Sequence, residues 1–136
     1  MAFVLMTVDM AWIFFAWACI QEGAREGVRY AVTGQVLSKT CETASIDSVI
    51  EKYSFGFVNS KNAASAISIQ YYSPTNLTTP LTGSTRNAGG NVVKVVVGPI
   101  TVGTFGPIFR HWQPIHLTAR FMDVMEGSPN GTPPCL

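Results

Sequence analysis

The first twenty residues constrain most strongly what this chain can fold into. From Met1 to Ile20 the sequence MAFVLMTVDMAWIFFAWACI is almost entirely apolar and contains neither glycine nor proline. A helix of about twenty such residues matches the hydrocarbon thickness of a bilayer. The run continues directly into QEGAREGVRYAVTG, which is charged and still favours a helix. We therefore expect one long helix, from about residue 2 to about residue 33, that starts in an apolar phase and ends in water.

The composition narrows the class of protein. The chain has 136 residues, of which only 12% are charged, and its formal net charge is +1. This balance argues against nucleic-acid binding, and it fits a subunit whose surface is covered by lipid or by other copies. The sequence has no G-x-S-x-G, P-loop or H-E-x-x-H motif, so we predict no enzyme and no cofactor. We also predict no metal. Of the candidate zinc ligands His111, His116, Cys41 and Cys135, only the two histidines have the spacing of a zinc site, and they flank Pro114 in an irregular stretch.

The apolar run differs from a secretory signal. It has no basic residues before it and no A-x-A-like cleavage site after it. We expect either that a basic leader has been removed or that the sequence starts late, and we favour the removed leader.

Two features of the long helix suggest contacts. Cys19, Gly23, Gly27 and Ala31 recur every four residues, a spacing that lets helices approach closely. Their partner is either another copy of the chain or its own sheet. Asp9 is the only charge in residues 1–21. It either meets a partner's N-terminus or another polar group during docking, or lies at the membrane boundary and reaches water. We favour the boundary position.

Aromatic residues are concentrated in the same part of the helix. We expect them to pack or to anchor the helix at the membrane–water interface: Trp12, Phe14, Phe15 and Trp17.

The remainder predicts a small head. Residues 45–60 read as a second helix with Ser45 as N-cap and an apolar face that reaches Phe57. A polar connection follows at 59–65. Alternating apolar residues then predict strands at 67–72, 91–97 and 115–122. The Ser/Thr/Pro/Gly-rich stretch 73–90 is expected to be an exposed loop, and the aromatic stretch 102–114 an apolar patch for a neighbouring subunit.

These elements predict an α+β fold with a long N-terminal hydrophobic helix, a short second helix and a small antiparallel sheet. Residues 1–34 form the assembly helix, and residues 35–136 form the head with its C-terminal tail. Cys41 and Cys135 are expected to form a disulfide that ties this tail to the head in an extracytoplasmic environment, while Cys19 stays buried.

Residues 22–34, EGAREGVRYAVTG, resemble the TadE-like pseudopilins of tight-adherence (Tad) systems, which are similar to type IV pilins. The preceding VDMAWIFF resembles the acidic, aromatic end of that family's membrane helix. AGGNVVKVVV and PIHLTARFMDVME resemble two of its strands. The chain departs from the family in its shorter apolar segment, which lacks an early Glu and an internal Pro. The glutamate linked to prepilin processing therefore matches no residue here.

The resemblance implies a structural subunit that waits in the bacterial inner membrane and then polymerises through its N-terminal helix into an extracellular pilus. Its partners would be other copies, the membrane before assembly and the inner-membrane pilus assembly machinery. The alternative is a membrane-anchored extracytoplasmic binding or accessory module. Whether the subunit is major or minor, and whether it serves adhesion, motility, DNA uptake or secretion, stays open. The residues expected to form the assembly helix are Phe3, Leu5, Asp9, Trp12, Phe14, Phe15, Trp17, Cys19, Gly23 and Gly27.

Sugar attachment is a separate question. Asn76-Leu77-Thr78 and Asn130-Gly131-Thr132 match the N-glycosylation sequon. In a chain that resembles a bacterial family we interpret both as chance matches. O-linked sugar on the Thr-rich loop around residues 75–85 would suit an outer surface.

Overall fold

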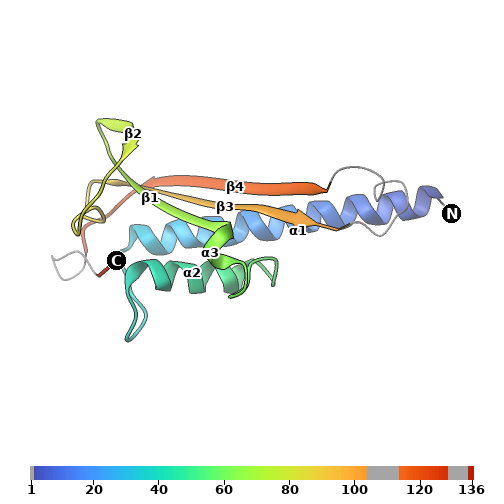
Figure 1. Ribbon diagram of the computed structural model, residues 1–136, viewed down its shortest axis with the longest axis horizontal. Helices are drawn as coiled ribbons and strands as arrows, with labels where there is room; N and C mark the ends of the chain where they lie inside the picture. The colour runs from blue at the N-terminus through green and yellow to red at the C-terminus, as the bar shows by residue number, and fades with distance from the viewer. Residues whose placement is uncertain (1, 104–113, 129–134) are drawn as a thin grey trace.

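The computed structural model describes residues 2–103, 114–128 and 135–136. Within these residues the chain forms an α+β fold, as predicted. Figure 1 shows α1 as the long axis of the molecule, with the sheet along one side and α2 along the other. The elements in chain order are α1 (Ala2–Val32), α2 (Glu42–Tyr53), α3 (Ala63–Ala66), β1 (Ile67–Ser73), β2 (Asn76–Pro80), β3 (Val92–Val102) and β4 (Ile115–Val124).

The long helix extends as the sequence predicts. It comprises 31 residues, which corresponds to a length of about 46 Å. Gly34 ends it with a φ of 60°, and the Gly34 N–H donates a hydrogen bond to the Ala31 carbonyl at 3.0 Å. A left-handed residue directly after a helix is a common way to stop it, and glycine adopts that conformation without steric cost.

The sheet is antiparallel, with strand order β2-β1-β3-β4. The predicted alternation is confirmed in its two central features: Val93, Val95 and Val97 of β3 are buried, and Lys94 lies on the opposite face. β3 is longer than expected because it continues past an irregularity between Val97 and Ile100. The apolar face of the sheet is thus aligned with the length of α1.

Two parts of the fold differ from prediction. The stretch 73–90, expected to be only a loop, contains β2, whose residues are all exposed. The stretch 59–65, expected to be only a connection, runs into the short helix α3. In both places local hydrogen bonding forms an element without an apolar pattern to announce it.

The predicted N-cap of the second helix is wrong. α2 starts at Glu42, and its N-cap is Cys41, whose backbone is extended. Ser45 lies buried inside the helix, where its hydroxyl donates to the Cys41 carbonyl at 2.8 Å. The helix also ends at Tyr53, before the predicted face is complete, because Phe55 and Gly56 have φ values of 52° and 85°.

The core lies between α1, α2 and the sheet. The C-terminal half of α1 belongs to it, so residues before and after position 34 share one core. Buried core residues on α1 are Ala16, Ile20, Ala24, Val28 and Ala31; those facing them include Ile46, Ile50, Val58, Tyr71, Val93, Val95, Val97 and Ala119.

Candidate membrane and assembly surface

The N-terminal half of α1 presents apolar side chains to its surroundings. Phe3 is 82% exposed, Phe14 66% and Trp17 44%. Only 22% of the most apolar window of this helix is buried inside the molecule, and the helix is long and apolar enough to cross a membrane. A helix that served as an ordinary core element would be mostly covered. Further exposed apolar residues on this half are Val4, Leu5, Met6, Val8, Met10 and Phe15.

One face of α1 stays uncovered along the head as well. We call it the uncovered ridge and define it by residues at helical spacing that neither α2 nor the sheet buries: Phe14, Trp17, Ala18, Gln21, Glu22, Arg25 and Arg29. The ridge is apolar up to Ala18 and polar beyond it. Near its C-terminal end, Arg29 pairs with Glu26 at 3.7 Å. The change from apolar to polar residues along α1 therefore occurs on a single continuous face.

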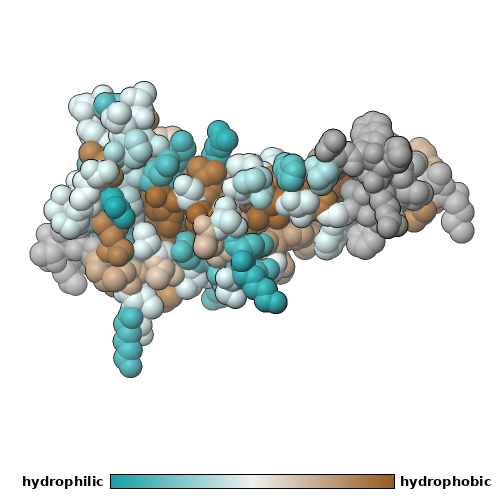
Figure 2. Space-filling view, in the orientation of Figure 1, coloured by the Kyte–Doolittle hydropathy of each residue, from teal (hydrophilic) through white to brown (hydrophobic). Residues whose placement is uncertain are grey.

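Hollows border this ridge next to β4, which is an edge strand. One has a volume of about 410 Å³ and is lined by Trp17, Ala18, Gln21, Glu22, Arg25 and Phe121. The next has a volume of about 360 Å³ and is lined by Arg25, Val28, Arg29, Phe121, Met122 and Asp123. Because they share Arg25 and Phe121, the hollows follow one another along the helix. In Figure 2, patches of apolar residues lie along the middle of the molecule, separated by more hydrophilic ones.

Aromatic rings mark where the head begins on α1. The Trp12 ring lies 5.6 Å from Phe57, and the Phe15 ring lies 6.3 Å from Phe57 and 6.4 Å from Phe55, measured between ring centroids. Tilted rings at such distances contribute about 0.5–1.5 kcal/mol per pair beyond the area they bury. Trp12 and Phe15, which we expected on the assembly surface, therefore pack on the loop after α2. Phe15 keeps about half of its surface exposed, and Trp12 less.

The small-residue stripe faces neither of its predicted partners. Gly23 and Gly27 lie against α2 of the same chain. A Cβ on Gly27 would lie 2.6 Å from Ile50 Cγ1, and one on Gly23 would lie 3.2 Å from the Ile50 carbonyl oxygen. Cys19 is buried and free. The spacing was read correctly as a close helix contact, but the contact is intramolecular, because α2 turns back antiparallel along α1 (Figure 1).

Asp9 also differs from expectation. Its side chain is fully buried within the chain, so it does not reach water at a membrane boundary, as we had favoured. The other expectation, contact with a second subunit, would require this position to become uncovered. Asp9 is thus a buried acidic residue on a half-helix whose side chains are mostly apolar and exposed.

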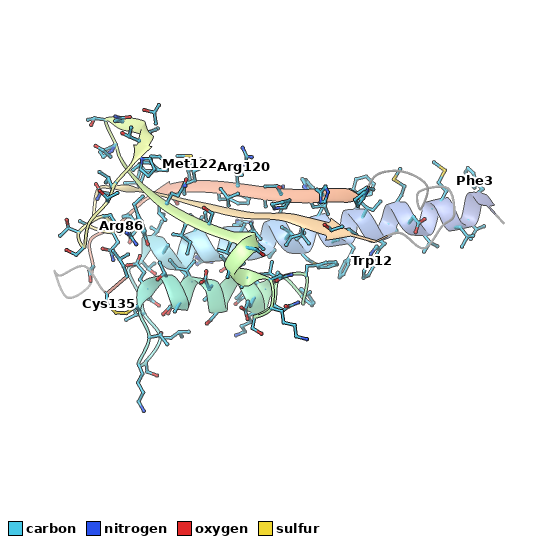
Figure 3. All side chains as sticks on the ribbon, viewed as in Figure 1. Phe3, Trp12, Arg86, Arg120, Met122 and Cys135 are labelled. Carbon is cyan, nitrogen blue, oxygen red and sulfur yellow. A yellow bond between two sulfur atoms is a disulfide. The ribbon has the colours of Figure 1, made fainter. Side chains whose placement is uncertain are left out.

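A cluster of polar side chains lies near the C-terminus, next to the start of α2. The structure contains the expected disulfide between Cys41 and Cys135, near the end of the molecule opposite Phe3 (Figure 3). The Glu42 N–H donates to the Cys135 carbonyl at 2.7 Å, so the tail caps the first turn of α2. The fully buried Glu42 carboxyl accepts hydrogen bonds from the Tyr71 hydroxyl, at 3.3 Å, and from Asn87 Nδ2.

Burial raises the pKa of Glu42, and the hydrogen bonds from Asn87 and Tyr71 oppose that shift. Burial also raises the pKa of Tyr71, with a further contribution from the adjacent Glu42. The Arg86 guanidinium lies 5.8 Å from the centre of the Tyr71 ring. The sequence did not predict this cluster, because its members come from three separate segments of the chain. The only hint in the sequence was that Glu42 directly follows Cys41, a residue expected to form a disulfide.

The histidines, the aromatic stretch and the second sequon remain to be placed. His116 lies on β4, with its Nδ1 3.1 Å from Thr101 Oγ1. His111 and most of the stretch 102–114 fall outside the described residues, as does Asn130. In the described ranges, no three His, Cys, Asp or Glu side chains lie close enough together to hold a metal ion.

Comparison of the chain with protein-family models, with curated proteins and with solved structures finds no match.

Proposed function

We propose that this chain is a structural, pilin-like subunit that is held in the bacterial inner membrane and then polymerises through α1 into an extracellular filament. The observation that carries the proposal is the uncovered ridge. It joins a mostly exposed apolar half-helix to a polar face of the same helix that the head leaves largely exposed, with Gln21 half-buried.

The apolar and polar halves of the ridge differ in what can cover them. Burying a large side chain such as Phe14 or Trp17 out of water is worth about 1.5–3 kcal/mol. In a membrane, lipid already removes these side chains from water and so provides most of this free energy. Association between helices in the membrane therefore depends mainly on how well their side chains pack. The polar half, from Gln21 to Arg29, lies beyond the reach of the lipid in this arrangement. Contact between neighbouring subunits would cover both halves.

The second candidate is a membrane-anchored binding or accessory module. The exposed apolar half of α1 would be enough to anchor it, and the hollows beside β4 would then hold part of another protein. This candidate needs α1 to remain in lipid, whereas the filament proposal needs α1 to leave it.

Two substitutions separate these candidates. Trp17→Ala keeps the helix apolar and so keeps the membrane location, but it removes a large packing surface. We expect it to reduce filament yield severely while the chain still fractionates with membranes. Phe14→Asp should abolish filaments, and because Phe14 is largely exposed the head should still fold.

The matched control is Leu77→Asp, which changes an equally apolar residue that is 51% exposed on β2, away from α1. Material sheared from cells is viewed by negative-stain microscopy with an antibody against the head. Filaments that carry the chain support the proposal. Normal filament yield from Trp17→Ala and Phe14→Asp, or a chain found only as a membrane-bound monomer, would contradict it.

A further inference from the structure

Hydroxyl side chains are concentrated on the hairpin formed by β1 and β2 and on the turn that follows. The segment from Ser73 to Thr85 reads SPTNLTTPLTGST, in which more than half of the residues are Ser or Thr and none is charged. Pro74 and Pro80 interrupt the run. Ser/Thr-rich sequence with proline is typical of segments that carry O-linked sugar.

This segment is placed where an enzyme can reach it. Residues 74–80 and 82–85 are exposed, and Leu81 is the member that packs against the core. The hairpin lies at the opposite end of the molecule from the N-terminus (Figure 1). If α1 is inserted in a membrane, the hairpin is therefore among the parts of the head farthest from the lipid.

The hydroxyl groups of this segment fall into two sets. Those nearest the hairpin tip hold the turn: Thr78 Oγ1 donates to Asn76 Oδ1 at 2.6 Å, and the Ser73 and Thr75 hydroxyls lie 2.9 Å apart. The second set makes no hydrogen bond to any residue that the structure describes, and it comprises Thr79, Thr82, Ser84 and Thr85. Modification of this second set would break no internal bond.

We propose that Thr79, Thr82, Ser84 and Thr85 are acceptor sites for O-linked sugar. The donor is a sugar whose anomeric carbon is esterified to a phosphate or pyrophosphate carrier. The hydroxyl oxygen forms a bond to the anomeric carbon, the bond from that carbon to the phosphate oxygen breaks, and the phosphate leaves with the electron pair. A base takes the hydroxyl proton, and nothing is oxidised or reduced.

The proposal requires the head to lie outside the cytoplasm but does not require polymerisation. It therefore stands or falls separately from filament formation. The Cys41–Cys135 disulfide reports on the location, because such bonds persist in oxidising compartments. A sample in which this disulfide has formed has reached the compartment in which the sugar is expected.

The test uses the full chain purified from its own cells. Intact mass is measured first, and electron-transfer fragmentation then locates any added mass. We expect the mass to exceed the sequence mass by whole sugar residues on at least one of the four sites. The variant T79V/T82V/S84A/T85V should lose all of this excess, whereas Thr118→Val, at an exposed hydroxyl on β4, should keep it.

Site mapping on the wild-type chain decides the matter even if the fourfold variant fails to form its disulfide. Three results would overturn the proposal. They are a disulfide-bonded chain with the unmodified mass, sugar attached only through the Asn76 amide, and sugar attached only to hydroxyls outside the four sites.

Discussion

Substituting Gly27 gives the sharpest test of how the head is packed. Gly27 lies against α2, and a Cβ there would meet Ile50 Cγ1 at 2.6 Å and Cδ1 at 2.9 Å. At Gly23 the nearest atoms would be the Ile50 carbonyl oxygen at 3.2 Å and Ser54 Cβ at 3.3 Å. The same change at the two glycines should therefore have different effects.

The magnitude follows from two opposing terms. Replacing glycine by alanine within a helix stabilises it by about 1 kcal/mol. Forcing an extra methyl group into a packed contact costs about 1–3 kcal/mol. For Gly27→Ala the second term should dominate, with a net loss of about 1 kcal/mol in the free energy of unfolding. For Gly23→Ala the terms should nearly cancel, and Gly27→Leu should lose considerably more than Gly27→Ala.

The assay is urea unfolding of the full chain in detergent micelles, followed by near-ultraviolet circular dichroism. Ala18→Leu, on the uncovered ridge, is the control for adding a large side chain to α1; Ala24 is unsuitable because it is fully buried. In an Ile50→Ala background the clash is absent, so Gly27→Ala should become stabilising. Equal effects of Gly27→Ala in both backgrounds would refute the close α1–α2 contact.

Two further predictions concern the end of the head that carries the C-terminus. Cys41→Ser with Cys135→Ser opens a loop whose ends are separated by 94 residues. The chain-entropy model gives a loss of about 4–5 kcal/mol, so the thermal midpoint by calorimetry should fall clearly, and an unchanged midpoint would contradict this. For Glu42, burial raises the pKa above its ordinary value of 4.5. The uncharged carboxyl therefore stabilises the fold fully below about pH 4.5, and this contribution is lost as the pH rises through the higher folded pKa. Glu42→Gln should flatten that part of the dependence of the unfolding free energy on pH, and an identical profile in wild type and variant would argue against a titrating Glu42.

The sequence predicted best those elements whose side chains alternate between apolar and polar surroundings. β1, β3 and β4 have such patterns and begin within one residue of the expected positions, although β3 continues to Val102. α1 was predicted instead from an almost unbroken apolar run followed by a charged helical stretch. β2 was missed because all of its side chains are exposed, which leaves no periodicity to detect. The start of α2 was placed too late because its cap comes from the distant Cys135 carbonyl and not from Ser45.

The candidate surface was predicted only in part for a related reason. Hydropathy identified the apolar half of α1, but it could not show which of its faces the head covers. Trp12 and Phe15 look like Phe14 and Trp17 in the sequence, yet they contact Phe57. Which side of α1 becomes covered depends on where the chain returns after α2, and that is decided by long-range packing.

The position of α1 between the sheet and α2 has a mechanical consequence. Held on two sides, the helix cannot turn about its axis unless the whole head turns with it. Contacts of the N-terminal half of α1 with lipid or with a neighbouring helix fix the rotation of α1 about its axis. They therefore also set the direction in which the hairpin of β1 and β2 points. Because successive helical residues are rotated by about 100°, inserting a single residue between Thr7 and Trp12 would swing the head through more than a quarter of a turn.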